Sequence, residues 1–273
     1  MQEYINPMGK IHNLHPRQNR LYYIVKKGGF LATLNEYKQG GSMEKVTYTM
    51  EDGIAQITMD DGKANAMDWG FFEEMGKSMD HAENDGAKIL VITGRPGFFS
   101  GGLDLKLLPT LSAREMKDFV TTFARTMLRV FSFPVPTIAA STGHAIAGGA
   151  MLTFACDRRF ALDGPYRIQM NETLIGIPLP TWMFLIARSA IPSRWRNEAL
   201  LHARAYNPTE ALERGMVDAV AQNADSLAAH VKAATAELLT LNLPAYAASK
   251  KNSRQADIEH VLDLLKKDLS GQA

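Results

Sequence analysis

A single carboxylate, Glu172, stands in a stretch that is almost free of charge. The stretch covers residues 168–178, IQMNETLIGIP, and its nearest preceding charge is Arg167. Removing a carboxylate from water raises its pKa toward neutrality, where the group can accept a proton and return it. Most glutamates are simply solvated, so the pattern alone leaves both roles open for Glu172.

Two glycine-bearing segments could present backbone N–H groups to a ligand. They are residues 99–105, FSGGLDL, and residues 143–150, GHAIAGGA, and each follows an expected strand. Glycine lets a ligand approach the backbone closely, and two N–H donors that converge on one oxygen form an oxyanion hole. Glycines also serve tight turns and close packing, and neither segment matches a Walker A or Rossmann fingerprint.

The elements that must position these segments alternate between strands and helices. Alternating apolar residues predict a hairpin over residues 46–59, Asp68 is placed to cap a helix, and Ser112 with Glu115 predicts a capping box. Further strands are expected over residues 88–93, 137–141, 159–162 and 217–220, and helices over 147–156, 209–214, 226–241 and 244–269. This order favours an α/β domain with mostly parallel connections.

Composition excludes several classes of protein. The 273 residues are 46% hydrophobic and 22% charged, with a net charge of +1, so no overall field attracts nucleic acid or an anionic membrane. No apolar run approaches the roughly 20 residues that cross a bilayer. The lone Cys156 rules out an internal disulfide and a cysteine-rich metal site. We therefore expect a protein of a reducing compartment, the cytoplasm, without nucleic-acid or membrane partners.

The first 42 residues differ from the rest, with six basic and two acidic residues. We interpret residues 1–42 as an N-terminal extension, native or not. A transit peptide is the competing interpretation, against which Glu3 and Glu36 argue. The remaining chain is expected to divide into a core at 43–235 and a C-terminal helical region at 236–273.

Taken together, these segments resemble the crotonase superfamily, also called the enoyl-CoA hydratase and isomerase family, over about residues 44–270. Residues 63–67 (KANAM), Cys156-Asp157 and residues 211–218 add to the match. The resemblance implies an α/β fold, the crotonase (ClpP-like) spiral of ββα units, with a C-terminal helical oligomerisation region. It also implies an acyl-CoA thioester substrate, no metal or other cofactor, and a homotrimer or dimer of trimers.

The resemblance also assigns roles to individual residues. Gly101 and Gly148 are expected to donate their N–H groups to the thioester oxygen, and Glu172 to move the proton. Coenzyme A is expected to contact Lys63, Ala64, Ala66, Gly101, Leu103, Asp104 and Lys250, although Lys250 also fits a solvated helix charge. His144, between Gly143 and Ala145, is expected to be a packed histidine rather than a catalytic one.

One departure from the family pattern favours a subclass. Hydratases of this family carry a second glutamate three residues after the second oxyanion glycine, where this chain has Met151. A thioether cannot orient or deprotonate water, so a single-glutamate reaction is expected, as in 3,2-trans-enoyl-CoA isomerases. The alternatives are a hydratase with a replacement acid such as Asp104 or Glu74, another acyl-CoA lyase or hydrolase, and a non-catalytic acyl-CoA-binding homologue.

Overall fold

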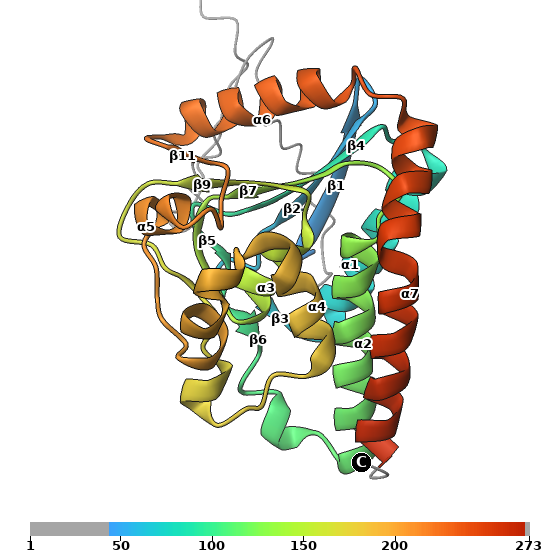
Figure 1. Cartoon of the computed structure of the whole chain (residues 1–273), viewed down its shortest axis with the longest axis vertical. Helices are drawn as coiled ribbons and strands as arrows, with labels where there is room; N and C mark the ends of the chain where they lie inside the picture. Colours follow the sequence, from blue (N-terminus) through green and yellow to red (C-terminus); the bar gives the residue numbers. More distant parts are fainter. Residues whose placement is uncertain (1–43, 271–273) are drawn as a thin grey trace, which may run out of the picture. The chain divides into compact units, whose positions relative to one another are not determined.

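The computed structural model describes residues 44–270, so the expected extension at residues 1–42 lies outside the described part. A six-stranded sheet has the strand order β1-β2-β4-β7-β9-β11 (Figure 1). The hairpin β1–β2 is antiparallel and the other pairs are parallel. Its strands are β1 (Val46–Glu51), β2 (Ile54–Met59), β4 (Ile89–Gly94), β7 (Thr137–Ser141), β9 (Arg158–Leu162) and β11 (Ala219–Ala221).

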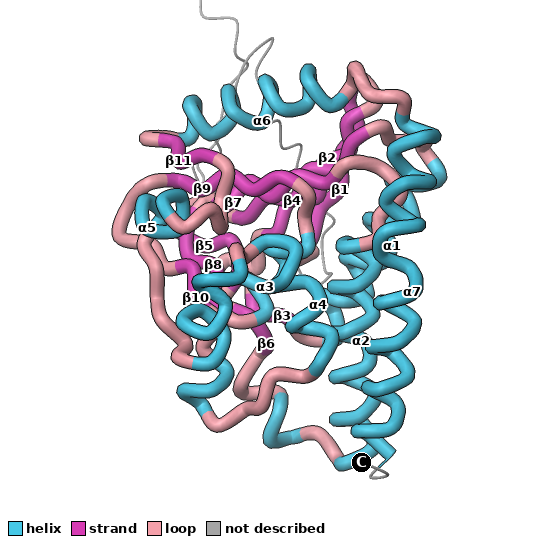
Figure 2. Tube along the Cα trace, in the orientation of Figure 1, coloured by secondary structure: helices cyan, strands magenta, loops and turns pink. Residues whose placement is uncertain are grey.

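Helices cover both faces of this sheet (Figures 1 and 2). One helix, α6 (Ala224–Leu238), runs along one face over β9 and β11, and α1 to α4 lie on the opposite side. Since both faces are covered, the parallel strands are buried and rich in apolar residues. The other helices are α1 (Trp69–Asn84), α2 (Ala113–Phe131), α3 (Gly148–Ala155), α4 (Thr181–Ala190), α5 (Pro208–Glu213) and α7 (Leu243–Ser270).

The local signals expected near the N-terminal side of the domain are confirmed. The hairpin pairs Val46 with Met59, and Asp68 caps α1 by accepting a hydrogen bond from the Phe71 N–H at 2.9 Å. Ser112 and Glu115 form the capping box of α2, each bonding the backbone of the other. These caps fix where α1 and α2 begin.

Two small parallel sheets carry the glycine-bearing segments. One has the order β10-β8-β5, with β5 at Gly97–Ser100, β8 at Gly143–Ile146 and β10 at Ile168–Gln169. The other pairs β3 (Ala66–Met67) with β6 (Gly102–Leu103). Backbones approach so closely here that a Cβ on Gly143 would lie 2.0 Å from the Gly97 carbonyl carbon, and one on Gly149 2.1 Å from the Ser100 oxygen.

Some elements differ from those expected. Helix α4 was not expected, and the strand expected over residues 217–220 begins two residues later, at Ala219. The expected boundary between residues 235 and 236 falls inside α6, so no linker separates the two parts there. Residues 172–175 form a short 3₁₀ helix that ends at Gly176, whose φ of 76° is left-handed.

Candidate active site

Two backbone N–H groups lie on adjacent segments where β6 meets the start of α3. Asp104 N donates to Met67 O at 3.0 Å, so the Leu103 N–H points away from β3, because successive N–H groups of a parallel strand face opposite sides. Gly148 is the first residue of α3, where an N–H has no intrahelical partner. A Cβ on Gly102 would lie 3.0 Å from Gly148 N, so the two segments are in contact.

The structure contradicts the prediction that Gly101 is one of the two donors. Its N–H already donates to the Ala64 carbonyl oxygen at 2.8 Å. The N–H group that faces away from the paired strand therefore belongs to Leu103, two residues after Gly101. Gly148, at the first position of α3, stays the predicted second donor.

The register between β8 and β10 brings the segment that leads to Glu172 toward the start of α3. Gln169 pairs with Ile146, and Gln169 O accepts the Ala147 N–H at 2.7 Å, which places the chain after Gln169 beside Gly148. The Glu172 residue is 4% exposed, and neither carboxylate oxygen has a hydrogen-bond partner among the described residues. Burial raises the pKa of Glu172 to about 7.

The position expected for a second glutamate is apolar, and the two candidate replacement acids make local hydrogen bonds of their own. Met151 follows Gly148 by one turn of α3 and is fully buried. Glu74 accepts the N–H groups of Lys45 and Val46 at 2.8 and 2.9 Å, which commits it to the start of β1. Asp104 closes a tight turn by accepting the Lys106 N–H at 2.9 Å. Glu74 is therefore engaged at β1, and Asp104 is engaged in a local turn.

The loop expected to contact coenzyme A is shaped by its own hydrogen bonds. The Asp61 carboxylate accepts the N–H groups of Lys63, Asn65 and Ala66, at 2.7, 2.9 and 3.1 Å. The N–H groups of Lys63 and Ala66 are therefore engaged, whereas the Lys63 side chain is exposed. The Ala64 carbonyl, bonded to Gly101, keeps a second lone pair for a ligand.

Sequence reasoning missed two side chains that hold this loop. Asn65, 1% exposed, has a left-handed φ of 51°, and its Nδ2 donates to the carbonyls of Met59, Phe98 and Phe99. Arg95 donates to Lys63 O at 2.8 Å and pairs with Asp60 at 3.2 Å. The Asn65 side chain stands inside the KANAM motif, but its partners are distant in sequence and only the fold reveals them.

The structure contradicts the prediction of Lys250 as a coenzyme A contact. Its ammonium is buried and pairs with Asp157 at 2.6 Å, and Arg254 pairs with the other Asp157 oxygen at 3.0 Å. Burial and Arg254 outweigh the attraction of Asp157 and lower the pKa of Lys250. The alternative of a solvated helix charge is wrong as well, because this lysine joins α7 to the core.

His144 is a packed residue, as expected. Its Nδ1 accepts the Arg167 N–H at 3.1 Å, and its ring contacts Phe98 and Tyr166 at centroid distances of 5.1 and 5.4 Å. Burial, with a contribution from the Arg167 charge, lowers the pKa of His144. These contacts give the imidazole a structural role.

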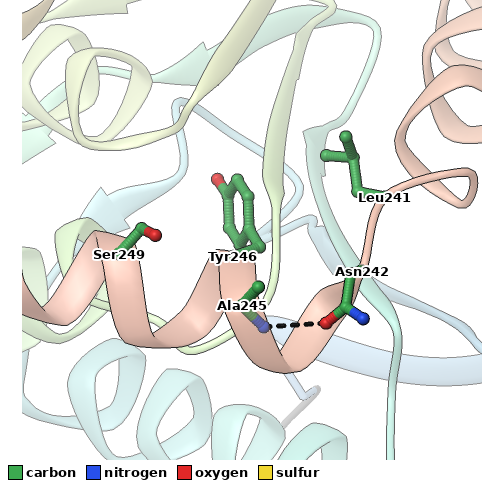
Figure 3. A pocket seen from close by; sticks show the side chains of 5 residues that line it. All are labelled: Leu241, Asn242, Ala245, Tyr246 and Ser249. Carbon is green, nitrogen blue, oxygen red and sulfur yellow. Dashed lines mark hydrogen bonds between the residues drawn. The ribbon is translucent and has the colours of Figure 1, made fainter.

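A depression of about 300 Å³ lies at the start of α7 (Figure 3), and Glu172 is not among the residues that line it. It is lined by Leu241, Asn242, Ala245, Tyr246 and Ser249. The one titratable group there is Tyr246, whose pKa burial and Asp157 raise further above its usual range. A phenol held in its neutral form is no base at neutral pH, so this depression is not the candidate active site.

Metal-binding clusters and membrane-spanning helices are both absent from the described residues. Between residues 44 and 270, no three or more His, Cys, Asp or Glu side chains are grouped so that they could hold a metal ion. No helix in the same range is long and apolar enough to cross a bilayer.

With this geometry established, comparison with known proteins defines the class. The family model for enoyl-CoA hydratase/isomerase matches residues 49–266. The chain therefore belongs to the enoyl-CoA hydratase/isomerase family, and its mixed α/β architecture with a C-terminal helix is the crotonase fold that the sequence predicts.

Individual relatives carry both of the family's activity names. The chain is 30% identical over 171 residues to human mitochondrial enoyl-CoA delta isomerase 1, a match that spans 62% of this chain and 57% of that protein. A solved enoyl-CoA isomerase of Mycobacterium tuberculosis is 33% identical, with a TM-score of 0.76 over 84% of this chain and 99% of that one. An enoyl-CoA hydratase of Mycobacterium marinum is 30% identical, with a TM-score of 0.75 over 82% and 99%.

Proposed function

We propose that the protein is an enoyl-CoA isomerase that shifts the double bond of a 3-enoyl-CoA to give the 2-trans-enoyl-CoA. The observation that carries the proposal is the buried Glu172 carboxylate, whose pKa of about 7 suits it to take a proton and return it. The fully buried Met151, in the position expected for a hydratase's second glutamate, supports a reaction with one carboxylate.

The chemistry assigns one step to each group. Glu172 removes a proton from C2 of the substrate, and the electron pair moves onto the thioester oxygen to form a dienolate. The N–H groups of Leu103 and Gly148 stabilise the negative oxygen, each contributing on the order of 3 kcal/mol to the transition state. Glu172 then returns the proton at C4, and the double bond forms between C2 and C3 in conjugation with the thioester.

Coenzyme A is expected to lie along residues 63–66, with the exposed Lys63 side chain near its phosphates and the Ala64 carbonyl available as an acceptor. The reaction needs no cofactor besides the coenzyme A of the substrate.

The proposal includes a homotrimer or a dimer of trimers, which sedimentation would check. Exposed Leu174, Ile175 and Leu201 support self-association, since they leave apolar surface near Glu172. A cytoplasmic location of the protein stays a prediction.

The test compares two substrates with the purified protein. We expect a trans-3-enoyl-CoA to gain the conjugated enoyl-thioester absorbance, and Glu172→Gln to reduce the rate by at least about a hundredfold. Glu213→Gln, the same change at an exposed position on α5, is the control and should keep the wild-type rate. Rapid hydration of a trans-2-enoyl-CoA with an inert 3-enoyl ester would overturn the proposal in favour of a hydratase.

Proton exchange separates the remaining alternatives. An enzyme that forms the enolate exchanges the C2 proton with deuterated solvent in a Glu172-dependent way. Binding of acyl-CoA without exchange would identify a non-catalytic homologue, and release of free coenzyme A would identify a hydrolase.

A further inference from the structure

Ser100 places a fully buried hydroxyl between two backbone segments of the site. The residue is 0% exposed and ends β5. Its Oγ donates to the Asn65 carbonyl oxygen at 2.7 Å and accepts the Gly102 N–H at 3.1 Å. One side chain thus joins the loop at residues 60–66 to β6.

The segment that this hydroxyl holds carries the Leu103 N–H. Gly102 precedes Leu103 and has a φ of 86°, a left-handed conformation that glycine adopts without strain but does not fix by itself. The hydrogen bond from Asp104 N to Met67 O fixes the chain on the C-terminal side of Leu103. The hydrogen bond from Gly102 N to the Ser100 hydroxyl fixes the chain on the N-terminal side, so the Leu103 N–H is held between two hydrogen bonds.

Ser100 also contacts the segment that carries the second donor. A Cβ on Gly149 would lie only 2.1 Å from the Ser100 carbonyl oxygen, and Gly149 directly follows Gly148. A shift of Ser100 therefore changes the spacing between β6 and the start of α3. Both peptide N–H groups depend on the same residue.

We infer that Ser100 is a positioning residue, which acts through the Gly102 N–H to hold the Leu103 N–H at the thioester oxygen. This inference rests on the proposed function, because it presumes an acyl-CoA thioester at the two donors. Ser100 contacts no reacting atom. Its removal should weaken polarisation of the carbonyl more than it weakens binding of coenzyme A, because the residues expected to contact coenzyme A keep their own hydrogen bonds.

The experiment uses Ser100→Ala, with Thr93→Val as the matched control. Thr93 is 3% exposed, and its hydroxyl donates to Ala140 O at 3.0 Å across the large sheet, so both changes remove one buried hydroxyl from a carbonyl. With a 3-enoyl-CoA, we expect Ser100→Ala to lower kcat about tenfold and to leave KM within about threefold. Thr93→Val should leave both values unchanged.

A spectroscopic readout tests the same point without turnover. The probe is a cinnamoyl-CoA thioester, whose absorbance moves to longer wavelength when donors polarise its carbonyl. We expect the wild-type protein to shift the probe, and Ser100→Ala to give a smaller shift at saturation. Thr93→Val should give the full shift, since a purely structural loss would not reduce it.

Each outcome decides one of the two claims. Equal shifts and equal kcat values for Ser100→Ala and the wild type would overturn the inference, as would a wild-type protein that binds the probe without any shift. A wild type that shifts the probe but does not isomerise the 3-enoyl ester would overturn the proposed function alone. Should Ser100→Ala fail to fold, Ser100→Cys replaces it: an intermediate shift supports the inference, and the full shift overturns it.

Discussion

The burial of Glu172 that suits it to move a proton also lowers the stability of the folded protein. An ionised carboxylate that is enclosed and has no hydrogen-bond partner costs free energy, which the unfolded chain avoids by solvating it. The protonated form is favoured in the folded state up to about pH 7, whereas the unfolded group titrates near its ordinary 4.5. The folded protein therefore binds the additional proton between these two values.

We predict that Glu172→Gln stabilises the protein in a pH-dependent way. Because the folded pKa is raised, the favourable contribution of the wild-type carboxyl group is present below pH 4.5 and is lost as the pH rises through about 7. The free energy of unfolding of Glu172→Gln, measured by urea titration, should exceed that of the wild type by less than about 1 kcal/mol at pH 5 and by about 3 kcal/mol at pH 8. Equal values at pH 8 would contradict the burial of this carboxylate.

Single residues of the site could be predicted only where their own surroundings in the sequence are informative. Glu172 stands out because its neighbours in the chain are uncharged, whereas its burial comes from the fold, since residues 173–178 are exposed. Gly101 was a wrong choice within its segment, since the bond from its N–H to Ala64 O depends on a loop 37 positions earlier in the chain. Lys250 was wrong for the same reason, because its partner Asp157 is 93 positions away.

Among the elements, α1 and α3 each contain two glycines, and one glycine of each, Gly76 and Gly149, is expected to respond differently to an added methyl group. We predict that Gly149→Ala on α3 abolishes isomerisation and lowers the unfolding midpoint, because its Cβ would lie 2.1 Å from the Ser100 oxygen. Gly76→Ala on α1 is the matched control, with nothing within 4 Å of its Cβ. It should raise the unfolding free energy by about 1 kcal/mol, as alanine does inside a helix. Thermal melts and the isomerase assay measure both; an active, stable Gly149→Ala would contradict the tight contact.

Long elements were predictable and short ones were not. α2 and β4 show clear periodicity or a continuous apolar run, and the caps at Asp68 and Ser112 mark where helices begin. β3, β6 and β10 have two residues each, too few for any pattern, and they form only because distant segments pair. α4 shows buried positions at Met183, Ile186 and Ala190, a spacing that could have revealed it.

Across the whole molecule, Asp157 joins α7 to the central sheet. It accepts the backbone N–H of Thr137 at the start of β7 and pairs with Lys250 and Arg254 on α7. Although burial raises it, the charges of Lys250 and Arg254 hold the pKa of Asp157 below its usual range. The stability that this cluster provides is present at neutral pH and is lost as the pH falls through the lowered pKa.

We predict that Asp157→Asn lowers the free energy of unfolding by about 3–5 kcal/mol, because it leaves two partly buried cations without their counter-charge. Chemical denaturation at pH 7 measures the loss. Asp157→Asn combined with Lys250→Met should recover part of it. Glu73→Gln, which breaks the exposed pair with Lys77, is the control and should cause no measurable change. A loss no larger than that of Glu73→Gln would show that α7 is held by apolar packing alone.

The close backbone contacts at Gly143 and Gly149 also limit how this protein can change over generations. A glycine packed this closely against the carbonyl of another backbone segment tolerates no side chain, whatever its polarity, so these positions offer no route to altered substrate preference. Met67 and Phe123 lie 3.0 and 3.3 Å from where a Gly148 Cβ would be, and side chains there can vary in volume without moving the backbone. New acyl specificities, in nature or in laboratory selection, are therefore expected to arise at Met67 and Phe123.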